Sequence, residues 1–238
     1  MAGTPAGLKR FYLVLAAVAV VGAGALAWVL RRPSTVSIPA NVTIQASDTA
    51  GFRGYVLGDS TAPVEITEFA DYQCPFCQTF ATLQMPTIRK RLIESGRLRW
   101  RFRDFPLQQH PHARTAAHAA ACADEQGKFW AMHDRIFEGQ AEWAAERDAT
   151  ATFRRYATEV GLDAAKYDVC MSAAKYAGRI QASHAEGMRI GVNSTPTLFV
   201  GGRLYQGRFD SDAITRLVDS LAAARPCFTG SWSRSTRS

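Results

Sequence analysis

The sequence predicts an α/β core that is interrupted by a block of helices. A β-prone run over 63–69 leads directly into two cysteines, Cys74 and Cys77, at what reads as the start of a helix. Helical patterns then fill about 111–191, and a short hairpin and a last helix follow. Strand and helix signals on both sides of a helical block are the order expected of a mixed α/β fold with an insertion.

The elements of the core follow one another in short steps. A short edge strand is expected near 54–57, and the helix that begins at Cys74 should run to about Glu94, with a kink at Pro86. The strand 97–103 alternates apolar residues with arginines, and we expect the arginines to form a solvated face rather than a docking patch. The further elements expected are helices at 113–125, 128–139, 150–160, 163–174, 175–190 and 210–223, and hairpin strands at 197–200 and 203–205.

The charge of the chain is concentrated outside the expected domain. The 238 residues carry a net charge of +7, but seven of the 28 basic residues lie before position 33 or after position 224. The stretch between these positions holds 21 basic and 21 acidic residues. A balanced domain has no general electrostatic attraction for phosphate, so we expect no nucleic-acid partner.

The N-terminal part contains an uncharged apolar run of twenty residues over 11–30. That length suits a bilayer span, and the preceding basic residues suit an export signal. We expect an uncleaved membrane anchor within 1–32, with a cleaved signal sequence as the alternative. The segment 33–52 is expected to be a tether, 53–225 the folded domain, and 226–238 a flexible tail.

The cysteine pair predicts redox chemistry. Free N–H groups and the positive end of the helix dipole stabilise a thiolate at Cys74, and Pro75 suits the first turn because its missing N–H is not needed there. A disulfide made from a stabilised thiolate is easily broken. Half of a zinc site is the first alternative, but no second Cys-x-x-Cys occurs, and we expect no metal and no cofactor. A static structural disulfide is the other alternative, although so tight a ring adds little stability.

The sequence resembles the thioredoxin superfamily, and most closely the DsbA-like disulfide oxidoreductases. The resemblance rests on Glu68-Phe69 before the first cysteine, the run 71–77, the helical insertion, and the run 192–197 before the hairpin. It covers about 55–223 and implies a thioredoxin fold with an all-helical insertion, preceded here by the transmembrane or signal helix.

The resemblance also implies roles for single residues. Cys74 would be the exposed nucleophile, Cys77 the shielded resolving thiol, and Pro196 a cis-proline beside them. Thr195, with Pro75 and Phe76, would contact the substrate chain. Phe76 departs from the Cys-Pro-His-Cys of the best-known members, which puts a very strongly oxidising potential in doubt.

Two further assignments concern buried groups. Glu68 is expected to relay the proton of Cys77, with an ordinary exposed acid as the alternative, because alternation with its neighbour does not settle its face. Cys122 and Cys170 lie in helical patterns, and the resemblance favours a disulfide between them over two buried thiols. Cys227 is left without an expected partner.

The expected function is that of an extracytoplasmic thiol oxidase at the cell membrane. It would pass the Cys74–Cys77 disulfide to exported cysteine-containing polypeptides and be recharged by a membrane quinone-linked thiol oxidase. A disulfide reductase or isomerase of the same fold is one alternative. A non-enzymatic chaperone or assembly factor is another.

Overall fold

The computed structural model describes residues 6–30 and 36–224, with side chains from 11 to 27 and from 36 to 224. It separates into two compact units, 1–35 and 36–238. The first contains helix α1 (Ala6–Leu30). Among the described residues, no helix combines the length and the apolar character needed to cross a membrane. The predicted tail and Cys227 lie outside the described residues.

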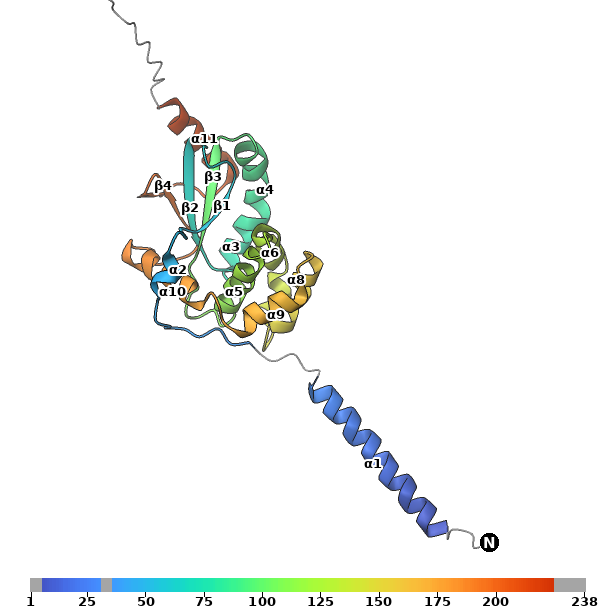
Figure 1. Cartoon of the computed structure of the whole chain (residues 1–238). Helices are drawn as coiled ribbons and strands as arrows, with labels where there is room; N and C mark the ends of the chain where they lie inside the picture. Colours follow the sequence, from blue (N-terminus) through green and yellow to red (C-terminus); the bar gives the residue numbers. More distant parts are fainter. Residues whose placement is uncertain (1–5, 31–35, 225–238) are drawn as a thin grey trace, which may run out of the picture. The chain divides into compact units, whose positions relative to one another are not determined.

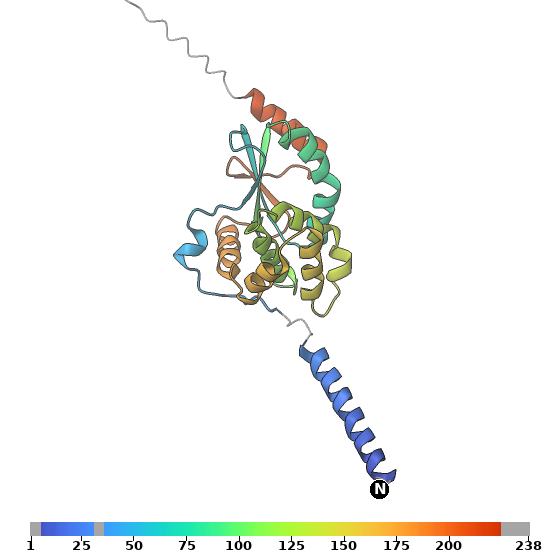
Figure 2. The ribbon, with the colours of Figure 1, turned by 45° about the vertical axis from the view of Figure 1, so that its right-hand side comes forward.

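A five-stranded sheet forms the centre of the second unit, in the order β1-β3-β2-β4-β5 (Figures 1 and 2). The neighbours β2 and β3 are parallel, whereas the other pairs are antiparallel. The parallel pair ends at the same edge of the sheet, where Ala70 stands opposite Asp104. The chain leaves β2 at this edge and enters the cysteine turn. The strands are β1 (Tyr55–Leu57), β2 (Val64–Ala70), β3 (Leu98–Asp104), β4 (Thr197–Val200) and β5 (Arg203–Leu204).

One face of the sheet is covered by the helix that follows the cysteines and by α11 (Ser211–Ala223). Ile66 of β2 and Trp100 of β3 are fully buried there, together with Ile88 and Ile214 from the two helices. Large apolar side chains on alternate strand positions therefore meet two amphipathic helices, and their burial is a main source of the stability of this layer.

The opposite face carries the arginines of β3, and here the expectation of a simple solvated face is wrong. Arg101 makes two hydrogen bonds to Glu65, at 3.0 and 2.8 Å, and Arg103 is only 8% exposed. Arg103 also pairs with Glu186 of α10 (Ala177–Arg189) at 2.7 Å. Acidic side chains on the neighbouring strand and on a distant helix supply partners that the alternation within one strand does not reveal.

The helix after the cysteines is not a single regular helix. It consists of α3 (Pro75–Thr79), a π-helical turn η1 (Phe80–Gln84), α4 (Met85–Ile88) and a second π-helical turn η2 (Arg89–Ile93). Pro86 lies at the start of α4, directly after the first wide turn. A proline cannot supply the regular backbone hydrogen bond, and a wide turn accommodates this without ending the helix.

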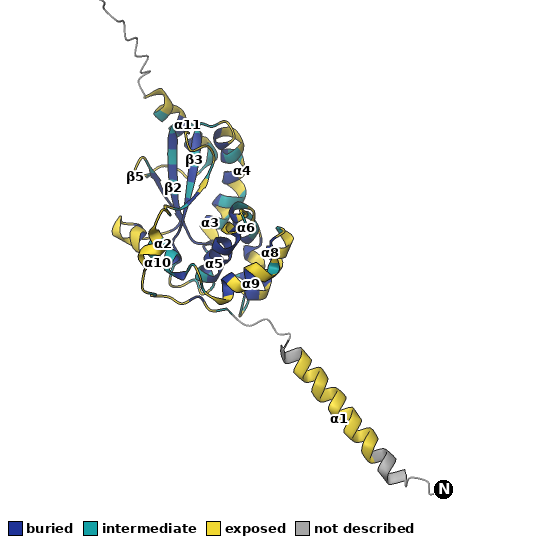
Figure 3. Cartoon of the chain, viewed as in Figure 1, coloured by how far each residue is buried: buried dark blue, intermediate teal, exposed yellow. Residues whose placement is uncertain are grey.

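The insertion between β3 and β4 is wholly helical, as expected. Its longest buried face belongs to α5 (Ala113–Asp124), in which small alanines allow close packing, and Figure 3 shows this helix in dark blue. Cys122 of α5 and Cys170 are joined by a disulfide with an S–S distance of 2.03 Å. The other helices are α6 (Phe129–Glu138), α7 (Gln140–Trp143), α8 (Thr150–Glu159), α9 (Ala164–Ser172) and α10.

The segment 36–52, part of the expected tether, lies against the folded unit. Ile38 is 6% exposed, and the backbone N–H of Val36 donates to the hydroxyl of Thr150. Phe52 packs on Tyr55, after the short helix α2 (Ala46–Thr49). A few apolar side chains are enough to hold a stretch of low periodicity on a surface.

Candidate active site

The two cysteines occupy the first turn of α3. Cys74 is the N-cap residue, with extended backbone angles, and Pro75 fills the first helical position. Cys77 follows one turn later and has no exposed surface, whereas Cys74 is 5% exposed. Both thiols are free. Cys74 is therefore the more accessible sulfur of the pair, although it is more covered than the expectation of an exposed nucleophile implied.

The two thiols have opposite acidities. The pKa of Cys74 falls to about 5, because the Cys77 thiol, the Thr195 side chain and the backbone N–H groups of Cys77 and Phe76 all stabilise its thiolate. The pKa of Cys77 rises well above its usual value, because burial and the neighbouring Cys74 disfavour a second negative charge. At neutral pH the pair thus consists of one thiolate and one thiol.

The loop before β4 approaches the pair from the other side. The Thr195–Pro196 peptide bond is cis, and Cys74 Sγ lies 3.3 Å from the carbonyl oxygen of Thr195. The hydroxyl of Thr195 is buried without a hydrogen-bond partner. Residues 121 positions apart in sequence are therefore brought into direct contact, with a main-chain segment beside the reactive sulfur.

Glu68 lies inside the protein, on the face of β2 that the active-site helix covers. It is 4% exposed, and the indole N–H of Trp100 donates to its carboxylate at 2.9 Å. Burial raises the pKa of Glu68 to about 7, and its charge raises the pKa of Cys77 in turn. An ordinary exposed acid, the alternative for this residue, is excluded.

Sequence reasoning did not identify the groups that hold the turn before Cys74. The buried carboxylate of Asp71 accepts hydrogen bonds from the backbone N–H groups of Gln73 and Leu107, each at 2.7 Å, and it contacts His110 at 2.8 Å. On the other side, Gln140 of α7 donates to backbone carbonyls of the same turn. An acidic residue directly after a core strand was the only available signal.

An apolar pocket of about 310 Å³ opens beside Pro196. Phe76, whose side chain is 76% exposed, stands at its edge, and Thr195 also lines it. The residues expected to contact substrate therefore lie on one surface, except that Pro75 is not among the residues that line this pocket. The remaining lining residues are Thr79, Phe80, Gln84 and Phe209.

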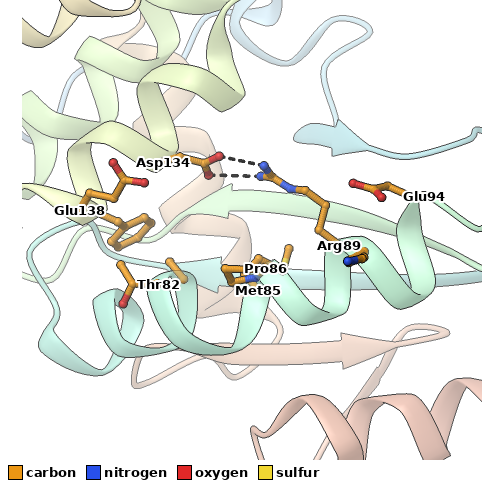
Figure 4. A pocket seen from close by; sticks show the side chains of 10 residues that line it. Thr82, Met85, Pro86, Arg89, Glu94, Asp134 and Glu138 are labelled. Atoms are coloured by element: carbon orange, nitrogen blue, oxygen red, sulfur yellow. Dashed lines mark hydrogen bonds and ion pairs between the residues drawn. The ribbon is translucent and has the colours of Figure 1, made fainter.

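A larger pocket of about 450 Å³ lies elsewhere, between the active-site helix and α6 (Figure 4). Arg89 and Asp134 cross it as an ion pair at 3.0 Å, above an apolar floor that includes Met85 and Phe137. Neither active-site cysteine lines it. We therefore treat this pocket as separate from the redox site.

Within the described residues, one group of side chains has the spacing of a metal site, namely His118, Cys122 and Cys170. The two sulfurs are joined in the disulfide. Metal binding by cysteine requires thiolates, so these residues do not form a metal site while the bridge is intact.

A sheet of this topology, a cysteine pair at a helix start and a cis-proline loop beside it define a protein of the thioredoxin class. The family model described as Thioredoxin matches residues 52–220, and the chain belongs to this family.

Solved structures of DsbA-like and thioredoxin-like proteins share the fold of this chain. It is similar to BdbD from Bacillus subtilis, with 24% identity over 71% of this chain and 92% of that chain, at a TM-score of 0.63. DsbA from Chlamydia trachomatis aligns over 79% of this chain and all of that chain, with 19% identity and a TM-score of 0.66. A thioredoxin-like oxidoreductase from Silicibacter pomeroyi shares 27% identity over 76% and 99% of the two chains, at a TM-score of 0.59.

Two relatives of similar sequence are named for a different activity. A Na⁺/H⁺ antiporter NhaA 3 of Salinispora tropica is 32% identical over 87% of this chain. A Na⁺/H⁺ antiporter NhaA 1 of Salinispora arenicola is 34% identical over 72% of it. The matches cover 32% and 25% of those proteins, so the chain spans about a quarter to a third of their length.

Proposed function

We propose that the chain is a protein thiol–disulfide oxidoreductase that introduces disulfides into exported polypeptides through Cys74 and Cys77. The observation that carries the proposal is that the pKa values of the two thiols are shifted in opposite directions. The pKa of Cys74 is lowered to about 5, and that of the buried Cys77 is raised. A static disulfide or a packing pair has no need of such a difference, whereas thiol exchange depends on it.

The reaction begins with the pair oxidised. A substrate thiolate attacks Cys74 Sγ and forms a mixed disulfide, while the Cys74–Cys77 bond breaks and its electron pair leaves on Cys77. A second thiolate of the substrate then attacks the substrate sulfur of the mixed disulfide and expels Cys74 as a thiolate. The substrate has lost two electrons, and the enzyme pair has gained them.

Three residues assist these steps in the proposal. Cys77 departs into a buried environment that disfavours a thiolate, and Glu68, protonated below about pH 7, can supply the proton it needs. The main chain of Thr195 lies 3.3 Å from Cys74 Sγ and can pair with an extended substrate segment. Pro196 keeps that segment beside the sulfurs without adding a hydrogen-bond donor.

The direction of transfer follows from the thiolate of Cys74. Because a thiolate stabilised at neutral pH is a good leaving group, its release drives oxidation of the substrate. The pair would be recharged by a membrane quinone-linked thiol oxidase. The domain would work on the periplasmic or extracellular side, behind the apolar segment 11–30 as anchor or export signal.

The redox equilibrium of the Cys74–Cys77 pair with glutathione tests the proposal. An oxidising pair stays reduced at glutathione ratios that oxidise an ordinary structural disulfide. Oxidation of a reduced two-cysteine peptide should require Cys74 and stop in Cys74→Ser. A strongly reducing pair that reduces insulin would support the reductase alternative. Equal peptide folding by wild type and Cys74→Ser would support the chaperone alternative.

A further inference from the structure

The disulfide between α5 and α9 lies against a histidine that no step of the proposed reaction uses. His118 is fully buried in α5, one turn before Cys122, and its Nδ1 lies 3.4 Å from Cys122 Sγ and 3.2 Å from Met171 Sδ. Two sulfur atoms on one side of an imidazole nitrogen make an environment that favours a proton donor at that nitrogen.

The opposite ring nitrogen fixes the tautomer. The backbone N–H of Tyr176 donates to His118 Nε2 at 3.1 Å, so that Nε2 is the acceptor and Nδ1 carries the proton. Burial lowers the pKa of His118 to about 4, although the Ala174 backbone acts to raise it. Because the pKa is this low, the ring is neutral near pH 7. A neutral ring with its proton on Nδ1 directs one N–H toward both sulfur atoms, Met171 Sδ at 3.2 Å and Cys122 Sγ at 3.4 Å.

Both cysteines of the bridge are buried, but only Cys170 lies against a surface pocket. Cys170 lines a surface pocket of about 370 Å³, whose rim carries Lys166 and Lys175, whereas Cys122 does not line it. Cys170 lies in the last turn of α9, and the chain after it adopts a left-handed conformation at Ala174, with φ of 47°. A helix end followed by a strained non-glycine residue opens more readily than a helix centre.

From these contacts we propose that the Cys122–Cys170 bridge is a second thiol-exchange site, at which a small anionic thiol attacks Cys170 and expels Cys122. The incoming thiolate forms a bond to Cys170 Sγ as the Cys122–Cys170 bond breaks. The electron pair leaves on Cys122, whose thiolate accepts the His118 N–H. No further oxidant or reductant takes part. The reverse attack by Cys122 on Cys170 restores the bridge and releases the small thiol.

The lysines select the charge of the thiol. Lys175 is paired with Glu125 at 2.8 Å, so Lys166 supplies the excess positive charge of the rim. A carboxylate- or sulfonate-bearing thiol is therefore favoured over a neutral one. The outcome is a reversible S-thiolation that frees α9 from α5 and does not require an active Cys74–Cys77 pair.

The first experiment uses the full chain with Cys74→Ser and Cys77→Ser, so that only the bridge and Cys227 carry reactive sulfur. The protein is incubated with 2-mercaptoethanesulfonate, quenched in acid, alkylated after denaturation and mapped by mass spectrometry. We expect the adduct on Cys170 and the alkyl group on Cys122. An adduct on Cys122, or an intact bridge until the protein is denatured, overturns the proposal.

Two variants test the contacts. His118→Phe removes the N–H, and we expect adduct formation to slow by about three- to tenfold, because a poorer leaving thiol departs more slowly. His184→Phe is the matched control. His184 lies on α10, its ring stacks on Phe105, and its replacement should leave the rate unchanged. An unchanged rate in folded His118→Phe contradicts the role of the N–H.

Lys166→Glu covers the case in which His118→Phe fails to fold, since Lys166 is exposed. The rate with 2-mercaptoethanesulfonate relative to neutral 2-mercaptoethanol should fall by about threefold in this variant. Equal ratios in wild type and Lys166→Glu contradict attack from the pocket at Cys170.

Discussion

Gln140, 66 residues further along the chain, donates a hydrogen bond to the backbone carbonyl of Cys74. Its side-chain Nε2 donates to the carbonyl oxygen of Cys74 at 3.1 Å and to that of Tyr72 at 2.6 Å, and the residue is only 6% exposed. One amide of the helical insertion therefore binds both sides of the turn that places Cys74 at the start of α3. The insertion supports the geometry of the redox pair as well as covering it.

Replacing this amide should weaken that turn. Gln140→Leu leaves the carbonyl oxygen of Tyr72 without its side-chain donor, while that of Cys74 keeps only the backbone N–H of Gln78, and we expect the free energy of unfolding to fall by about 2 kcal/mol. Cys77 should also be alkylated faster in the reduced protein, because the turn that shields it opens more often. Urea denaturation and timed iodoacetamide labelling measure the two effects.

Gln126→Leu is the matched control for Gln140→Leu. Gln126 also makes two hydrogen bonds to backbone atoms, both to Asp163, but far from the cysteine turn in the fold. It should lower stability without changing the labelling of Cys77. If both variants change Cys77 labelling equally, Gln140 has no specific effect on the site.

The parts of the site that sequence could predict are those with local signals. Cys74 and Pro75 mark a helix start by themselves, and the apolar alternation of β3 marks a strand, so their positions followed from short windows. The cis bond at Pro196 came from resemblance alone, because isolated X-Pro bonds are mostly trans.

The parts that sequence could not predict depend on long-range pairing. Gln140 lies 66 residues from Cys74, and an amide in a helical pattern carries no signal of its partner. The pairing of Arg103 with Glu186 spans 83 residues and converted an expected solvated face into a buried ion pair. The face of Glu68 was likewise fixed only by the helix that packs over β2.

The hydroxyl of Thr195 should help to hold the Cys74 thiolate. It is buried, and the Thr195 side chain acts to lower the pKa of Cys74. Thr195→Val keeps the shape and removes the hydroxyl, so we expect the pKa of Cys74 to rise from about 5. Thiolate absorbance at increasing pH measures the midpoint in the reduced protein.

Thr197→Val controls for a general disturbance of the proline loop. Its hydroxyl donates to the carbonyl of Ser194 at 2.7 Å, so its loss affects the loop without removing a group that acts on Cys74. The midpoint for Cys74 should stay at its wild-type value. A shift of equal size in both variants would assign the effect to the loop backbone rather than to the Thr195 hydroxyl.

Burial of Glu68 should make stability depend on pH. An unburied glutamate ionises with a pKa of 4.5, whereas that of Glu68 is about 7 in the folded protein. Protonated Glu68 therefore makes its full contribution to the free energy of unfolding below pH 4.5. This contribution, about 3 kcal/mol, is lost as the pH rises to about 7. Glu68→Gln keeps an acceptor for Trp100 and removes this loss.

The measurement compares unfolding free energies of wild type and Glu68→Gln at pH 4.5 and pH 8. The variant should gain about 3 kcal/mol relative to wild type between these values. Other titrating groups, such as buried Asp104, are common to both proteins and cancel in the difference. Glu138→Gln on the exposed side of α6 should show no such gain. A constant difference at both pH values would place Glu68 in a solvated environment.

The bridge between Cys122 and Cys170 should dominate the stability of the insertion. It closes a loop of 48 residues, and chain-entropy arithmetic gives about 4 kcal/mol for a loop of this length. Cys122→Ala with Cys170→Ala should lower the free energy of unfolding by up to that amount. The alanines fit helices in which most neighbours of Cys122 are already alanine, so the packing loss is small.

Hydrogen exchange should rise first in α9, which the bridge ties to α5, while β2 and β3 keep their protection. Unchanged exchange in α9 would mean that packing alone holds this helix, and that the bridge adds no local restraint.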